Sequence, residues 1–163
     1  MQIKSKNDNK YLEMITVNTN ESIIIREMKE SDIDQIIKMD KSISGIFRPE
    51  MWKAEIEHYL KNNSISLVAE IQEQVVGFMI GSMHPWLFGI ENGGWIEVLG
   101  VHPDHTAKGV GKKLGNKLFT EFKAHNIKVV YTCVEWTSSD LLEFFKTLEM
   151  NKSDFITLMK QLY

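Results

Sequence analysis

The chain has 163 residues, a length that suits one compact domain with its own buried core. Its 19 basic and 22 acidic residues give a formal net charge of -3, which argues against a general nucleic-acid binder. The single cysteine, Cys133, excludes an intramolecular disulfide framework, and no apolar run approaches the roughly 20 residues needed to span a bilayer. We therefore expect a reducing cytoplasm as the location, and neither nucleic acid nor a membrane as a partner.

The first 21 residues are predicted to form an extension that precedes the folded domain. They are too polar for a secretory signal, and their clustered lysine, asparagine and aspartate residues predict a mobile segment. An additional edge strand stays an open alternative at 14–17, because these residues include a short apolar group. The expected organisation is therefore an extension over 1–21 and one domain over 22–163.

The first half of the domain predicts a strand, two helices and a hairpin. Three consecutive isoleucines predict a strand over 22–28. Ser31 is predicted to cap a helix, because apolar residues then recur at helical spacing. Pro49 fits the first turn of a second helix. Strands over 64–71 and 75–83 follow, with a connection short enough for an antiparallel hairpin.

The second half predicts alternating strands and helices. Residues 84–94 are expected to form a loop that is rich in aromatic residues and ends in two glycines. The remaining elements are expected as a strand at 95–101, a helix at 109–122, a strand at 128–134, a helix at 138–148 and a last strand at 155–162. With no internal repeat or linker, this order predicts one α/β domain with a mixed sheet.

The segment 101–111 predicts a binding site for an anion. Gly109 and Gly111 permit turns that other residues resist, and they let a ligand approach the backbone closely. A helix begins at once, so unpaired N–H groups and the positive end of its dipole point to one place. Lys108 and Lys112 add positive charge. A pyrophosphate is the expected guest.

Two other phosphate-binding motifs fail on spacing. A P-loop would need glycine at Thr106 and serine or threonine at Lys113. A dinucleotide fingerprint would need glycine at Leu114, and Gly115 lies one position too late. The alternative that the glycines only shape a strand-to-helix turn stays open.

The segment resembles the acyl-CoA-binding motif of the GNAT superfamily of N-acetyltransferases. That motif has an apolar strand, then V-x-P, then Arg/Gln-x-x-Gly-x-Gly/Ala at the start of a helix. Leu99, Val101, Pro103, Gly109 and Gly111 occupy the matching positions. The order of elements also matches over most of the chain. The resemblance implies a mixed, mostly antiparallel central sheet flanked by about four helices, and acetyl-CoA as the acyl donor.

The resemblance also implies which residues hold that donor. The backbone of 99–101 would pair with the pantetheine arm, and the strand at 95–101 would splay away from the one at 128–134. The loop 106–112 would hold the pyrophosphate, and Ser138 stands where the family often has an asparagine that contacts the cofactor. The implied cofactor-binding residues are Leu99, Gly100, Val101, Thr106, Ala107, Lys108, Gly109, Val110, Gly111, Lys112 and Ser138.

Two departures from the family pattern affect the expected chemistry. Thr106 replaces the usual arginine or glutamine, which weakens pyrophosphate binding without removing the backbone amides. Phe145 stands where many members carry a tyrosine that protonates the departing thiolate, and a phenyl ring cannot act as an acid.

Glu97 is the predicted general base. An alkylammonium loses its proton only near pH 10, so a base must help the acceptor amine to become neutral before it attacks. Trp95, Glu97, Leu99 and Val101 are expected to alternate onto one face of their strand, and this would place Glu97 just before the thioester. The alternative is a surface or ion-paired carboxylate.

Other candidate residues are expected to have structural roles. Cys133 is expected to be a small buried residue and Tyr131 a core residue, with Tyr131 as an alternative acid. His102 and His105 are expected to be exposed in the loop, and His84 is isolated, so no metal site is predicted.

These patterns predict an acetyl-CoA-dependent N-acetyltransferase that acts on a primary amine of a small molecule or a protein. The alternative is a catalytically weak module that binds CoA or acyl-CoA. The resemblance also admits a homodimer.

Overall fold

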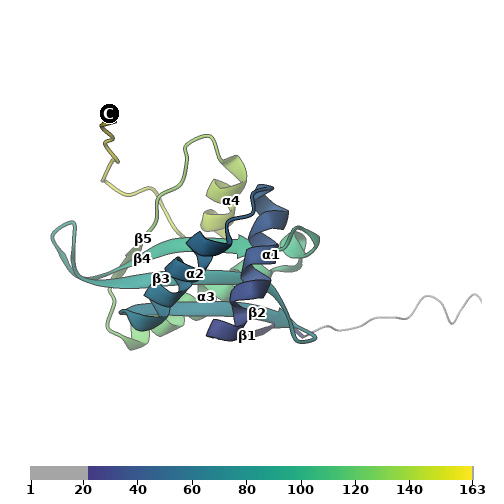
Figure 1. Cartoon of the computed structure of the whole chain (residues 1–163). Helices are drawn as coiled ribbons and strands as arrows, with labels where there is room; N and C mark the ends of the chain where they lie inside the picture. The colour runs from purple at the N-terminus through teal and green to yellow at the C-terminus, as the bar shows by residue number, and fades with distance from the viewer. Residues whose placement is uncertain (1–21, 163) are drawn as a thin grey trace, which may run out of the picture.

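Five strands form one sheet in the order β1-β2-β3-β4-β5 in a computed structural model that describes residues 22–162 (Figure 1). The strands are β1 (Ile24–Glu27), β2 (Ser64–Ile71), β3 (Gln74–Leu87), β4 (Ile90–Val101) and β5 (Val129–Tyr131). Neighbours from β1 to β4 are antiparallel, and β5 is parallel to β4. The predicted mixed, mostly antiparallel sheet is therefore confirmed. The predicted extension over 1–21 lies outside the described residues.

Helices cover both faces of the sheet (Figure 1). The helices α1 (Ile33–Ser44) and α2 (Pro49–Lys61) pack on one face, where Ile36, Ile56 and Phe78 belong to one core cluster. The helices α3 (Val110–Ala124) and α4 (Ser139–Thr147) pack on the other face, in a second cluster that holds Leu114, Leu118, Phe122 and Phe145. Two short 3-10 helices, η1 (Glu30–Asp32) and η2 (Pro103–Lys108), precede α1 and α3.

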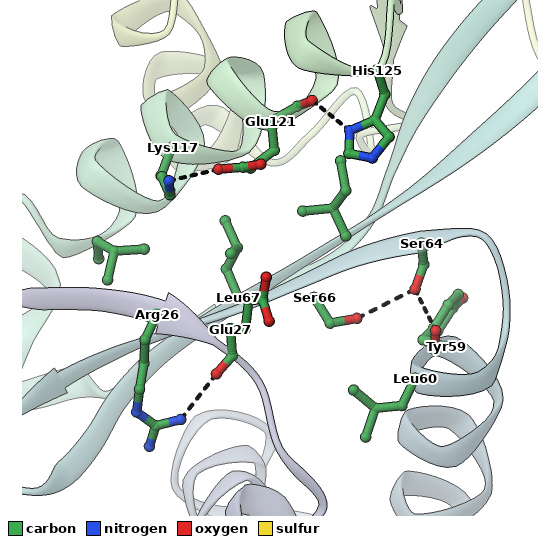
Figure 2. Close-up of a pocket in the computed structure, with 12 residues that line it drawn as sticks. Arg26, Glu27, Tyr59, Leu60, Ser64, Ser66, Leu67, Lys117, Glu121 and His125 are labelled. Atoms are coloured by element: carbon green, nitrogen blue, oxygen red, sulfur yellow. Dashed lines mark hydrogen bonds and ion pairs between the residues drawn. The ribbon is translucent and has the colours of Figure 1, made fainter.

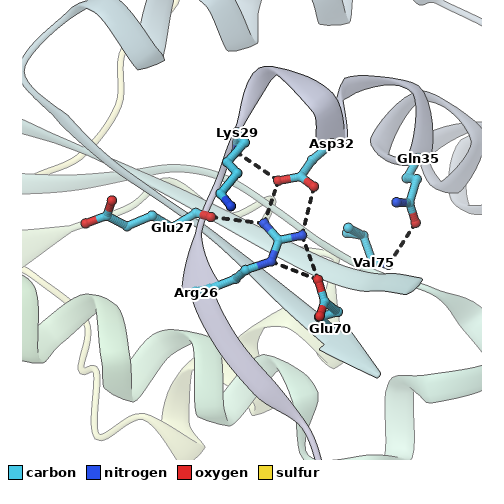
Figure 3. A network of polar contacts seen from close by, with 7 residues as sticks. All are labelled: Arg26, Glu27, Lys29, Asp32, Gln35, Glu70 and Val75. Carbon is cyan, nitrogen blue, oxygen red and sulfur yellow. Dashed lines mark hydrogen bonds and ion pairs between the residues drawn. The ribbon is translucent and has the colours of Figure 1, made fainter. Parts of the chain in front are cut away.

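A buried ion cluster fixes the start of α1 against the sheet (Figure 3). Two nitrogens of Arg26 in β1 contact the two carboxylate oxygens of Asp32 at 2.7 and 2.9 Å, and a third donates to Glu70 of β2 at 2.8 Å. Asp32 also accepts the backbone N–H of Lys29 at 2.8 Å. Burial alone would raise the pKa of Asp32, but the hydrogen bonds from Arg26 and Lys29 hold it below its usual value. The cluster therefore ties β1, β2 and α1 together.

The predicted loop over 84–94 is wrong. The strands β3 and β4 continue through it as a long hairpin that turns at Phe88 and Gly89. Both turn residues have positive φ, 52° and 78°. Such angles suit a two-residue hairpin turn, because they match the right-handed twist of the flanking strands. Pairing across the hairpin satisfies the backbone polar groups that a loop would have left to water. Figure 1 shows the hairpin projecting well beyond the rest of the sheet.

The last predicted strand, 155–162, is also wrong. The residues after α4 form neither helix nor strand, and the C-terminal segment leaves the sheet in Figure 1. Five large apolar side chains in it are 46–89% exposed. An apolar run forms a strand only where it finds a partner edge, and this segment pairs with none among the described residues. No helix within residues 22–162 is long and apolar enough to cross a membrane.

Candidate active site

The pairing between the two parallel strands β4 and β5 ends near the middle of β4. It begins at Gly93 opposite Val129 and ends at Trp95 opposite Tyr131. The hydroxyl of Thr132 then donates to the carbonyl of Ile96 at 3.1 Å. β5 stops at Tyr131 instead of continuing to 134, and the splaying expected between the strands at 95–101 and 128–134 stays a prediction.

The far half of β4 has one free edge. Residues 98–101 pair with Ile80 through Gly77 of β3, and no strand lies on their other side within residues 22–162. A free strand edge presents alternate N–H and C=O groups to an extended ligand. Leu99, Gly100 and Val101, which the sequence predicts as pantetheine-binding, all lie on this edge.

The loop after β4 leads into the N-terminus of α3. Gly109 joins η2 to α3 with φ 76° and ψ 11°, a left-handed conformation that suits glycine. The first backbone bond of the helix runs from Lys113 N–H to Gly109 C=O at 3.1 Å. The N–H groups of Val110, Gly111 and Lys112 therefore have no acceptor inside the helix. This geometry is compatible with the backbone anion site that the sequence predicts.

The residues around the N-terminus of α3 are accessible to an anionic ligand. Thr106, Ala107, Lys108 and Lys112 are exposed, so their backbone and charges are open to solvent. The hydroxyl of Thr106 donates to the carbonyl of Pro103 at 3.1 Å and so belongs to the turn itself.

Three further predicted residues have well-defined positions. Gly111 is helical, and a Cβ built on it would lie 2.8 Å from the ring of Phe144 in α4, so the missing side chain lets α4 pack against the start of α3. Val110 is fully buried, which leaves only its backbone for a ligand. Ser138 is half-buried and precedes α4, and its side chain makes no capping hydrogen bond.

Glu97 lies in a β-bulge of β4. The register with β3 shifts between Ile80 and Gly81, which leaves Glu97 without an opposite residue. A bulge interrupts the alternation of side chains. As a result Val98 packs against the α1–α2 cluster, whereas Leu99 packs against the α3–α4 cluster.

The expectation that Trp95, Glu97, Leu99 and Val101 share one face is therefore wrong. Leu99 and Val101 lie on the α3 side. The carboxylate of Glu97 instead contacts Ser82 and His84 of β3, which follow the buried Ile80 at two-residue spacing on the α1–α2 side.

Ser82 and His84 are residues that sequence reasoning missed. The hydroxyl of Ser82 donates to Oε1 of Glu97 in a short hydrogen bond, and its oxygen also lies 2.8 Å from Nε2 of His84. Nε2 of His84 lies 3.9 Å from the same carboxylate oxygen. The i, i+2 spacing of Ser82 and His84 indicates two side chains on one face of a strand. The prediction of a loop over 84–94 hides this signal, because it ends the strand before His84.

Several other expectations change. Cys133 is exposed instead of buried, because β5 ends two residues earlier and strand alternation no longer places it inside. Tyr131 is half-buried outside both core clusters, with its ring 5.4 Å from that of Phe88. His102 and His105 are half-buried instead of exposed. Among the described residues, no group of three or more His, Cys, Asp or Glu side chains is placed to hold a metal.

A separate groove lies away from these features (Figure 2). It has a volume of about 480 Å³ and runs between the end of β1, the start of β2, the end of α2 and α3. Its charged residues include Lys117 and Glu121, which pair with each other at 2.6 Å. It shares no residue with the open edge of β4 or the loop at Gly109, so it lies apart from the candidate site.

An open strand edge that leads into a glycine turn and a free helix N-terminus can hold an extended ligand that carries an anionic group. The comparisons agree: residues 32–149 match the Acetyltransferase (GNAT) family, and the chain belongs to that family. The protein is accordingly an acetyltransferase, and acetyl-CoA is its acetyl donor.

Individual relatives support the assignment. An acetyltransferase of Pectobacterium atrosepticum is 26% identical over 142 residues, which cover 85% of this chain and 94% of the relative. Two solved structures share the fold. The aminoglycoside N-acetyltransferase AAC(6')-Iy in complex with CoA has a TM-score of 0.78 at 15% identity, over 89% of this chain and 98% of the other. A ribosomal-protein-alanine N-acetyltransferase from Brucella melitensis has a TM-score of 0.70 at 19% identity, over 87% and 100%.

Proposed function

We propose that the protein transfers the acetyl group of acetyl-CoA directly to a primary amine of a small molecule or a protein. The observation that carries the proposal is the second half of β4, which pairs with β3 on one side and has a free edge on the other. The carboxylate of Glu97 lies near the middle of this strand, and the free N-terminus of α3 lies beyond its end. One extended ligand can contact both features, with its phosphates at the helix and its acyl end near Glu97.

The proposed donor site consists mainly of backbone. Leu99, Gly100 and Val101 offer the strand edge to the pantetheine arm. The N–H groups of 106–112 and the charges of Lys108 and Lys112 face the pyrophosphate, and Ser138 borders the cofactor from the start of α4. The open surroundings of Gly109, where an added Cβ would meet no atom within 4 Å, fit a bulky anion at this turn.

Acetyl-CoA supplies an activated acyl group in the form of a thioester. Glu97 accepts a proton from the acceptor ammonium, either directly or through a water molecule, so that a neutral amine attacks the carbonyl carbon. Backbone N–H groups of the open strand stabilise the negative charge that develops on the carbonyl oxygen. The C–N bond forms as the C–S bond breaks.

Protonation of the leaving thiolate does not use the usual tyrosine position. Phe145 occupies it, is 6% exposed and packs in the core with Leu114 and Leu148. A thiolate is a good leaving group near neutral pH because a thiol has a pKa of about 8.5. Solvent protonation is therefore sufficient for turnover.

The acceptor is a primary amine of unspecified structure. The two solved relatives are named for an aminoglycoside and for a ribosomal-protein alanine, that is, for a small molecule and for a residue of a protein. The carboxylate of Glu97 favours a cationic group in either case. A cytoplasmic location and a homodimer stay predictions from the sequence.

Ligand binding is the first test. Thermal unfolding should move to higher temperature with acetyl-CoA and with CoA, and should not move with NAD. Release of free thiol would then be followed with propylamine, spermidine, lysine and a tetrapeptide with a free N-terminus. No stabilisation by saturating CoA would refute the proposal.

The role of Glu97 has a matched control on the same strand. Glu97→Gln should lower kcat at least a hundredfold with little change in CoA affinity, since an amide cannot take up the proton. Glu91→Gln changes an exposed carboxylate of β4 near the hairpin tip and should leave both values unchanged. Equal turnover in the two variants would remove Glu97 from the mechanism.

The alternative function is a CoA-binding module with little activity. The observation that favours it is the loss of two family residues, at Thr106 and Phe145. Stabilisation by CoA without thiol release for any amine of the panel would support this alternative over the enzyme.

A further inference from the structure

Glu97 belongs to a three-residue cluster on the α1–α2 side of the sheet. Ser82 and His84 come from β3, and the bulge of β4 brings Glu97 beside them. The Ser82 oxygen lies within hydrogen-bond distance of both Oε1 of Glu97 and Nε2 of His84, the latter at 2.8 Å. The side chain of His84 is 41% exposed and that of Glu97 is 25% exposed, so the cluster borders solvent.

The hydrogen-bond chain has a direction. A serine hydroxyl has one proton, and Glu97 receives it as the acceptor. The contact between Ser82 and His84 is then complete only if Nε2 of His84 carries a proton and donates it. The chain therefore runs from His84 to the Ser82 oxygen, and from the Ser82 hydroxyl to one carboxylate oxygen, Oε1.

The other oxygen of Glu97 is left for a ligand. Oε2 has no hydrogen bond or ion pair with any residue of the described part of the chain. From these contacts we propose that Ser82 and His84 are positioning residues, which hold Oε1 so that Oε2 faces the acceptor ammonium. The inference rests on the proposed role of Glu97 as the base.

The variants test each link of the hydrogen-bond chain. Ser82→Ala breaks the chain, and Ser82→Thr retains a hydroxyl. His84→Gln retains a hydrogen-bond donor, whereas His84→Ala removes it. His125→Gln changes a histidine at the end of α3, outside the cluster, and serves as the control.

Steady-state kinetics would use the amine of the panel with the fastest thiol release. Ser82→Ala and His84→Ala should lower kcat about tenfold, because a base that is no longer held in place loses much of its effectiveness. Ser82→Thr should recover most of that loss, and His84→Gln should retain more activity than His84→Ala because it keeps a donor.

A spectroscopic readout does not depend on the acceptor. In the CoA-bound protein, ¹⁵N NMR should show the Nε2–H form of His84 with a slowly exchanging proton. Ser82→Ala and Glu97→Gln should both speed up that exchange, because each removes a link of the chain. A purely structural role for Ser82 would change the unfolding temperature but would not couple this proton to Glu97.

The outcomes distinguish this inference from the proposed function. Wild-type kcat in both Ser82→Ala and His84→Ala, together with wild-type proton exchange of His84 in Ser82→Ala and an inactive Glu97→Gln, would overturn the inference and leave Glu97 as the base. Full activity of Glu97→Gln would refute the base itself. If Ser82→Ala fails to fold, the partly exposed His84 provides the test: wild-type kcat in His84→Ala, with Glu97→Gln inactive, overturns the proposal.

Discussion

Replacement of Gly109 tests whether the turn at α3 serves the ligand or only the fold. Gly109 has φ 76°, and an added Cβ would meet no atom within 4 Å, so an alanine there causes backbone strain but no collision. The left-handed conformation costs an L-residue roughly 1–2 kcal/mol. Alanine also reduces the conformational freedom of the unfolded chain, which raises the free energy of unfolding by about 0.4–1 kcal/mol. Gly109→Ala should therefore lower the free energy of unfolding by about 1 kcal/mol, or the unfolding temperature by roughly 2–4 °C.

Gly109→Asn is the matched variant, because asparagine adopts the left-handed conformation more readily than alanine. Its unfolding temperature should stay close to that of the wild type. Both variants nevertheless place a side chain beside the free N–H groups of Val110, Gly111 and Lys112. If those groups hold the pyrophosphate, the Kd for CoA should rise about tenfold or more in both variants.

Isothermal titration with CoA, together with thermal unfolding of the free proteins, separates the two roles. A loss of CoA affinity in Gly109→Asn at nearly unchanged stability supports a ligand-binding turn. Wild-type affinity in that variant would refute the reasoning, and Gly109 would then be a turn glycine only.

Three further changes test the charges of the molecule. Lys108→Ala combined with Lys112→Ala should raise the Kd for CoA about fivefold at low salt and less at high salt, as titration at two ionic strengths would show. Thr106→Arg, which restores the usual family residue, should lower that Kd about threefold in the same titration. Asp32→Asn should destabilise the fold by about 2 kcal/mol in urea unfolding, because Arg26 loses its main partner. Since the pKa of Asp32 is lowered in the folded state, its contribution is present above about pH 4 and is lost on acidification, so the variant should show a flatter stability curve there.

The part of the site that could be predicted from the sequence is the part that is built locally. Pro103 and Gly109 end a strand and start a helix through their own backbone preferences, and Leu114 and Leu118 mark the buried stripe of that helix. The strand β2 has the predicted bounds, Ser64–Ile71, because its apolar run is buried on both faces. These features need no knowledge of the rest of the chain.

The part that could not be predicted depends on partner strands. The bulge at Glu97 is a property of the register between β4 and β3, and period-two alternation within one strand cannot show it. The same is true of His84, whose role depends on Ser82 and Glu97 facing it across the hairpin. The burial expected for Cys133 assumed a longer β5 than the sheet supports.

The C-terminal segment shows how a local pattern can mislead, and its removal gives a direct test. A chain that ends at Lys152 loses an apolar run that the sequence predicts as a strand. If that run were a buried strand, each large apolar side chain would contribute about 2 kcal/mol, and removal would unfold much of the domain.

In the structure, Ile156, Leu158, Met159 and Leu162 are 79–89% exposed. Only Phe155 is substantially covered, with its ring stacked on Phe88 at 4.7 Å. The truncation should therefore cost about 1 kcal/mol, and Phe155→Ala in the full chain should account for most of that loss. A cost of several kcal/mol for the truncation, with a small one for Phe155→Ala, would mean that the segment packs as the strand its sequence predicts.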